Sequence, residues 1–240
     1  MRIGVPQMPR FFSMTDVKKI RPQHREYSRQ VQDYFRRLFP RREWKLITDP
    51  VASPLAVDVE LLYPTVEEPF YLLHTVGMSA EPQSYPSGSL TPDQGAYSEL
   101  CLMLPADWPF PAKQISLSDP AAWPIWLLME LGRFPHVHHM WMSYGFMMPN
   151  TEQCLPFSRL TQFSGVLVVQ FEGELGELKM SDGTTVELLM PVPVYSEEMA
   201  LCDDIGTDAL IDDIVEGNGG SFLVDMHRPN VGTDAYQKNK

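Results

Sequence analysis

The stretch from Leu104 to Asn150 decides the fold of this chain. It opens with LPADWPF (104–110), continues with AAWPIWLLMELGRFP (121–135) and closes with HVHHMWMSYGFMMPN (136–150). Four of the five tryptophans of the chain lie in it. Because large aromatic side chains bury the most area per residue, we expect the hydrophobic core to be built around this stretch.

A buried helix is predicted inside this stretch, between residues 118 and 133. Pro124 suits the first helical position, and the body IWLLMEL (125–131) is apolar almost all round. Gly132 suits a left-handed cap, and Pro135 is expected to prevent the helix from continuing. We therefore predict that the chain turns near Gly132 and returns as a strand over residues 136–148.

An amphipathic helix is predicted for residues 22–39, ending before Pro40. Its apolar residues recur at helical spacing, and they are Tyr27, Val31, Tyr34, Phe35, Leu38 and Phe39. Strands are predicted by apolar or β-branched runs at 57–63, 70–78, 97–104, 163–171 and 221–226. In the first of these runs apolar residues alternate with Asp58 and Glu60, which predicts a half-exposed strand.

The last third of the chain is predicted to contain a hairpin and two short helices. Residues 178–189 form the hairpin, with Asp182 and Gly183 as a two-residue turn. Ser196 and Thr207 are expected to cap the helices, and Gly217 is expected to end the second one. Strands and helices mixed in this order indicate an α+β domain.

Length and composition favour one domain in the cytoplasm. The chain has 240 residues, of which 44% are hydrophobic, enough for one sizeable core. We divide it into an N-terminal arm (1–21), a domain (22–228) and a polar C-terminal tail (229–240). No run reaches the roughly 18 apolar residues of a membrane span, and no secretory signal is present. Three scattered cysteines suit a reducing compartment.

Charge is distributed unevenly along the chain. Residues 1–50 hold 12 Lys and Arg against 5 Asp and Glu, whereas the remaining residues hold 7 against 26. The acidic remainder argues against a nucleic-acid partner and suits a basic protein partner. The candidate partner-binding residues are the carboxylates of the two short helices: Glu197, Glu198, Asp203, Asp204, Asp212 and Asp213.

The sequence contains no recognisable catalytic or cofactor-binding motif. G-x-S-x-G, the P-loop and G-x-G-x-x-G are all absent. His74 lies inside an apolar run, where a hydrogen-bonded core histidine is the simpler interpretation. On a strand His136 and His138 would share a face and could bind one metal, but the pattern lacks a third ligand. We therefore predict no catalytic residue, no cofactor and no metal.

Two other functions stay open on the residues alone. One is an enzyme or metal-binding protein that uses His74, or His136 and His138 with His139 beside them. The other is a scaffold subunit that docks in a complex through an exposed helix 22–39. The oligomeric state does not follow from the sequence.

The order of segments resembles the suppressor of fused family. The matching stretches are FYLLHTVGMS (70–79), YSELCLMLPADWP (97–109), WPIWLLMELGRFPH (123–136), WMSYGFMMPN (141–150), FSGVLVV (163–169), YSEEMAL (195–201) and FLVDMHRPN (222–230). The resemblance covers the chain from about Tyr27 to Asn230. These motifs are core and turn patterns, specific as a set rather than singly.

The resemblance implies a single domain with a mixed, largely antiparallel sheet flanked by helices, and no catalytic residues. The animal member of the family is a binding protein that sequesters zinc-finger transcription factors. Its peptide groove needs a second domain, which this chain is too short to hold, so we carry over none of its binding residues. Stand-alone domains of this type look bacterial. The resemblance therefore implies a non-enzymatic protein-binding domain, such as an immunity protein or antitoxin that neutralises a basic toxin by stoichiometric binding.

Overall fold

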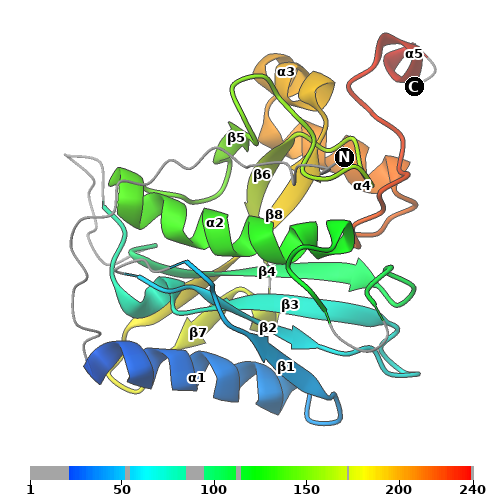
Figure 1. Ribbon diagram of the computed structural model, residues 1–240. Coiled ribbons are helices and arrows are strands. Elements are labelled where there is room, and N and C mark those ends of the chain that lie inside the picture. Colours follow the sequence, from blue (N-terminus) through cyan, green and yellow to red (C-terminus); the bar gives the residue numbers. More distant parts are fainter. Residues whose placement is uncertain (1–21, 52–54, 85–94, 112–114, 172, 239–240) are drawn as a thin grey trace, which may run out of the picture.

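The fold is one mixed sheet with helices on both faces (Figure 1). The computed structural model describes residues 22–51, 55–84, 95–111, 115–171 and 173–238, so the predicted N-terminal arm lies outside the described residues. The strands are β1 (Trp44–Ile47), β2 (Asp58–Leu62), β3 (Phe70–Val76), β4 (Tyr97–Pro105), β5 (Met147–Pro149), β6 (Gly165–Gln170), β7 (Glu177–Lys179) and β8 (Thr185–Val194). The helices are α1 (Pro22–Leu38), α2 (Trp123–His138), α3 (Ser196–Ile205), α4 (Thr207–Gly217) and α5 (Asp234–Gln237).

In the part of the chain that the structure describes, the sheet has eight strands in the order β1-β2-β3-β4-β8-β6-β5, and β7 also pairs with β8. Among these strands β4 and β8 run parallel, and the other pairs are antiparallel. This confirms the predicted α+β class with a mixed, largely antiparallel sheet. No described helix is both long enough and apolar enough to cross a membrane.

Helix α1 covers one face of β2, β3 and β4, as its apolar stripe predicted. Tyr27, Val31 and Phe35 are at most 2% exposed and pack with Leu62 and Leu72 in one cluster. The opposite side of α1 presents arginines to solvent. Burial of this stripe makes α1 part of the core, so the stripe is not free to dock a partner.

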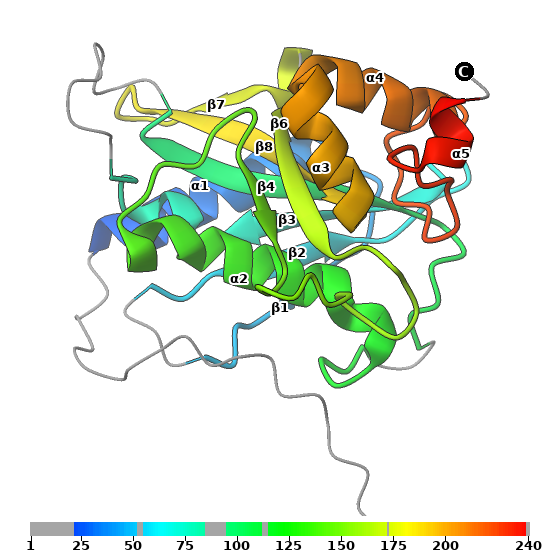
Figure 2. The same cartoon turned by 90° about the horizontal axis from the view of Figure 1, so that it is seen from above.

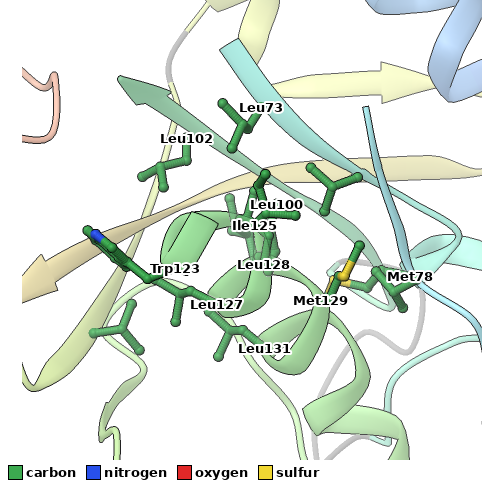
Figure 3. Close-up of a cluster of buried hydrophobic side chains, with 14 of the residues drawn as sticks. Leu73, Met78, Leu100, Leu102, Trp123, Ile125, Leu127, Leu128, Met129 and Leu131 are labelled. Atoms are coloured by element: carbon green, nitrogen blue, oxygen red, sulfur yellow. The ribbon is translucent and has the colours of Figure 1, made fainter. Parts of the chain in front are cut away.

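Helix α2 covers the other face and forms the centre of the largest core cluster (Figure 3). Ile125 and Leu128 are fully buried and belong to the same cluster as Leu73 and Leu100 of β3 and β4. The predicted aromatic core is confirmed by Trp108 and Trp123, and two other tryptophans, Trp126 and Trp141, are half-buried. Figure 2 shows α3 and α4 side by side over β6 and β8, with which they form a third cluster.

The predicted end of α2 at Gly132 is wrong. The helix continues to His138, and His139 takes the left-handed cap with φ 50°. Pro135 lies in the last turn, where its missing N–H leaves a single upstream carbonyl without a helical donor. Residues 136–138 are therefore helical, and the strand predicted over 136–148 is reduced to β5. Gly132 instead gives space to Val57, whose Cγ1 would lie 2.8 Å from an added Cβ.

The strand predicted at 57–63 forms as β2, but the prediction that it is half-exposed is wrong. Glu60 of β2 is 0% exposed because α1 covers the face on which it lies. Its carboxylate accepts hydrogen bonds from Gln32 and Arg36 of α1, at 2.9 Å and 2.5 Å. An alternating pattern thus shows which residues share a face, but here the polar face is buried as well.

The hairpin of β7 and β8 is confirmed, although its turn is longer than predicted. Met180 N donates to Thr184 O at 2.8 Å, so three residues, 181–183, form the turn, and Gly183 has φ 89°. The predicted helix caps are displaced by one residue. Tyr195 precedes α3 and Gly206 precedes α4, and Ser196 and Thr207 are the first helical residues.

The strand predicted at 221–226 does not form. Pairing of β4 with β8 ends at Leu100 and Leu189, and the chain after α4 bridges the two strands beyond that point. Val224 N donates to Met103 O of β4 at 3.0 Å, and Arg228 Nη2 donates to Pro193 O of β8 at 3.0 Å. Residues 229–238 continue along the domain, and Val231 is fully buried.

Candidate functional site

His74 lies in the core and not at a surface site. Its side chain is 0% exposed, and its ring stacks on Phe35 with 3.8 Å between ring centroids. Nδ1 lies 3.0 Å from Thr75 O, and Nε2 lies 3.3 Å from Glu60 Oε2. Both ring nitrogens thus face protein groups, and the ring is closed to a substrate.

The structure does not bring His136, His138 and His139 together as a metal site. His136 and His138 occupy the last turn of α2, where residues two apart point in different directions. His136 is half-buried, and burial lowers its pKa to about 4, although a hydrogen bond with the Met78 backbone acts in the opposite direction. His138 and His139 are exposed. Within the described residues, no three His, Cys, Asp or Glu side chains lie close enough to hold a metal.

The six acidic candidates on α3 and α4 divide into exposed and buried residues. The carboxylates of Glu197, Asp203, Asp204 and Asp212 are exposed, whereas Glu198 is 0% exposed and Asp213 is 4% exposed. Gln237 Nε2 lies 3.5 Å from Asp213 Oδ2. Only the four exposed carboxylates can therefore meet a partner on this surface.

Glu198 has a structural contact that its neighbour Glu197 lacks. Both of its carboxylate oxygens accept from the Arg228 guanidinium, at 2.5 Å and 2.6 Å. They also accept from the backbone N–H groups of Tyr195 and Val231, each at 3.0 Å. The guanidinium lies over the rings of Phe163 and Tyr195. This bidentate pair holds the chain after α4 against the start of α3.

Exposed carboxylates lie along α3 and α4, and we call this region the acidic surface. It contains Glu197, Asp203, Asp204, Asp208, Asp212 and Glu216, all exposed. Asp208 and Glu216 were missed as candidates. They could have been found from a longer-range signal, because residues 180–227 contain 11 Asp and Glu and no Lys or Arg.

Two exposed apolar side chains belong to the same region. Ile205 at the end of α3 is 40% exposed, and Tyr144 in the loop before β5 is 48% exposed. The Tyr144 hydroxyl donates to Asp208 Oδ1, and this hydrogen bond raises the pKa of Tyr144 to about 12. The phenol therefore stays protonated at neutral pH. A tyrosine and an aliphatic side chain among carboxylates resemble the anchors of protein interfaces.

Comparison with known proteins places this arrangement in a family. The sequence model of suppressor of fused protein (SUFU) matches residues 55–229, which is more than half of the chain. The chain belongs to the suppressor of fused family. The resemblance seen in the sequence is thereby confirmed. Comparison with curated protein sequences gives no significant match.

Solved structures of the suppressor of fused fold agree with this assignment. A homologue from Neisseria gonorrhoeae FA 1090 has a TM-score of 0.60 and 14% identity, covering 86% of this chain and 97% of that one. A chain of the Sufu–Fu complex has a TM-score of 0.63 and 16% identity, covering 89% and 95%. Drosophila suppressor of fused has a TM-score of 0.62 and 16% identity, covering 89% of this chain and 52% of that one. At these identities the likeness concerns the fold.

Proposed function

We propose that this chain is a non-enzymatic protein-binding domain that acts in the cytoplasm by stoichiometric binding. Its partner is a basic protein, and the acidic surface on α3 and α4 is the binding face. The observation that carries the proposal is the exposure of six carboxylates on these helices, in a stretch of 48 residues without Lys or Arg. An uncompensated surface of one sign attracts partners of the opposite sign and accelerates their association.

The comparisons support a protein-binding role. One of the similar structures is a complex of Sufu with Fu, so that protein of the same fold binds another protein. Another is a bacterial homologue, 97% of which is covered by this chain, so a domain of this size also occurs in a bacterium. A protein partner in one similar structure and a bacterial origin in another favour an immunity protein or antitoxin that neutralises a basic toxin.

The first experiment identifies the partner. The tagged chain is incubated with lysate of the source organism, and proteins that remain bound at low salt are identified by mass spectrometry. We expect one basic protein at near-equal stoichiometry, released at high salt because exposed charges are screened. Co-expression of that protein with and without this chain then tests the antitoxin role. Growth arrest that this chain does not relieve would contradict the antitoxin role.

Charge neutralisation then tests the binding face. The variant Asp203→Asn, Asp204→Asn, Asp212→Asn, Glu216→Gln removes four exposed carboxylates from α3 and α4. We expect its association rate constant at low salt to fall about tenfold or more while the dissociation rate changes little, because exposed charges act mainly on encounter. Stopped-flow or surface-based kinetics measures both rates.

A matched control separates the acidic surface from net charge. The control variant removes the same number of exposed carboxylates elsewhere on the domain, through Glu43→Gln, Glu67→Gln, Asp107→Asn and Glu152→Gln. We expect this control to associate almost as fast as the unmodified chain. Equal effects of the two variants would show that total charge, and not this surface, steers the partner.

A further inference from the structure

The outer edge of β1 is a second candidate surface, separate from α3 and α4. β1 is the end strand of the sheet, and β2 is its one strand neighbour among the described residues. Tyr63 N donates to Glu43 O at 2.8 Å, and the register places Trp44 opposite Leu62. Because hydrogen-bonded and non-hydrogen-bonded pairs alternate in an antiparallel ladder, the backbone N–H and C=O groups of Trp44 and Leu46 point away from β2.

The side chains of these two residues are exposed as well. Trp44 is 49% exposed and Leu46 is 38% exposed. Both lie on the face that α1 covers farther along the sheet, and the Arg36 guanidinium lies 3.5 Å from the Trp44 ring centroid. An edge protected against pairing carries proline or charged residues at such positions. β1 instead combines apolar side chains with outward backbone groups that pair with no other described strand, which is what strand-addition sites offer.

The charges around β1 determine which kind of segment fits. Arg37 and Arg41 are exposed and Lys45 is half-buried, against one exposed acid, Glu43. A second copy of β1 would bring these cations opposite themselves. Residues 1–21 of the chain hold five Lys and Arg against one Asp, so they have the same sign. An acidic segment of another protein is the occupant whose charge complements this edge.

We propose that the edge of β1 binds an extended acidic segment of a partner protein, which adds to the sheet as a further strand. Its backbone pairs with Trp44 and Leu46, its apolar side chains contact the same two residues, and the acidic residues that alternate with them lie on the other face of the sheet, near Lys45. This site is independent of the acidic surface, because β1 and the β6–β5 side covered by α3 and α4 are at opposite ends of the strand order (Figure 1). β1 also precedes the residues matched by the family.

A phage-displayed library of random peptides, selected on the intact chain, tests the proposal without a known partner. We expect the enriched peptides to alternate apolar and acidic residues. Synthetic copies should bind Leu46→Glu about tenfold or more weakly, because the new carboxylate repels them and the apolar contact is lost. Leu46→Pro should weaken them similarly, because proline removes the outward N–H while leaving the β1–β2 ladder intact.

The control is Leu155→Glu, which makes the same change at a leucine that is 55% exposed and lies far along the chain. It should bind the selected peptides as tightly as the unmodified chain does. Thermal unfolding of each variant verifies that the fold is retained, and Lys45→Glu provides a third test if Leu46→Pro is unstable. Two results would overturn the proposal. One is that the selected peptides contain no acidic residues, and the other is that they bind Leu46→Glu and Lys45→Glu with the affinity they have for the unmodified chain.

Discussion

At the scale of single residues, the buried ionisable groups explain more of the structure than the exposed ones. Because a carbonyl oxygen only accepts, His74 Nδ1 must donate to Thr75 O. Nε2 then faces Glu60 Oε2 at 3.3 Å. Burial alone would raise the pKa of Glu60, but hydrogen bonds from His74 and Arg36 outweigh it and hold the pKa below its usual value. These contacts fasten α1 to β2 and β3.

His136 gives a prediction about pH. Its pKa is lowered from 6.5 to about 4 in the folded chain, mainly by burial. Between these values the unfolded chain binds the proton and the folded chain does not, so stability falls as the pH drops from about 6.5 toward 4. We expect His136→Gln to reduce the loss of unfolding free energy between pH 7 and pH 5 by about 1–2 kcal/mol. Urea unfolding at both pH values measures this difference.

The control is His227→Gln, which makes the same change at an exposed histidine outside α2. Its loss of stability between the two pH values should equal that of the unmodified chain. If His136→Gln and His227→Gln behave alike, the lowered pKa of His136 is not a source of acid sensitivity, and the buried carboxylate networks must account for it.

At the scale of elements, periodicity predicted most of the helices and strands, and it failed where tertiary contacts override local signals. The apolar stripe of α1 and the apolar runs of β3, β4 and β6 were sufficient to predict these elements, because the apolar residues of each pattern are the ones that the fold buries. Pro135 was expected to end the helix, but it lies in the last turn of a buried helix. There its missing N–H leaves only one carbonyl of the preceding turn without a hydrogen-bond donor. The chain after α4 could not be predicted, because its course depends on where β4 and β8 cease to pair.

The candidate site shows the same limit. Glu197 and Glu198 are adjacent and alike in sequence, yet one is exposed and the other is fully buried. Glu198 forms an ion pair with Arg228, which is 30 residues away, whereas Glu197 accepts hydrogen bonds from Ser196 and Asn230. Composition could therefore locate an acidic region on α3 and α4, but the choice among its carboxylates required the three-dimensional arrangement.

Gly132 gives a prediction for α2. It lies in helical backbone, and an added Cβ would meet Val57 Cγ1 at 2.8 Å. We expect Gly132→Ala to destabilise the fold by about 1–3 kcal/mol through overpacking, although alanine favours a helix. Combining it with Val57→Ala removes the clash, so the double variant should be more stable than the sum of the single effects by about 1 kcal/mol or more. Denaturant unfolding of all four chains measures this coupling.

The coupling also separates two roles for Gly132. If this glycine were the left-handed cap expected from the sequence, alanine would destabilise through backbone strain alone, and Val57→Ala would not relieve it. If the changes in unfolding free energy of Gly132→Ala and Val57→Ala simply add in the double variant, Gly132 acts as a left-handed cap. That result would contradict the close packing of α2 on the segment before β2.

At the scale of the whole molecule, charge is separated in space as well as along the chain. Residues 22–51, which contain α1 and β1, hold seven Lys and Arg against four Asp and Glu, whereas residues 180–227 hold 11 Asp and Glu and no Lys or Arg. The two regions cover different parts of the sheet (Figure 1). At neutral pH the net charge of −12 keeps copies apart despite this separation. Near the isoelectric point, at about pH 4.9, that repulsion vanishes and the opposite surfaces can attract each other.

We therefore predict reversible head-to-tail association near pH 5 at low salt. It should disappear when salt is added, because screening shortens the reach of exposed charges to about 10 Å at 0.1 M. Light scattering or sedimentation measures the association. The variant with Asp203, Asp204, Asp212 and Glu216 neutralised should associate less than the matched control with Glu43, Glu67, Asp107 and Glu152 neutralised, although both have the same net charge. Equal association of the two would show that loss of net charge alone, and not the separation of acidic from basic surfaces, brings the molecules together.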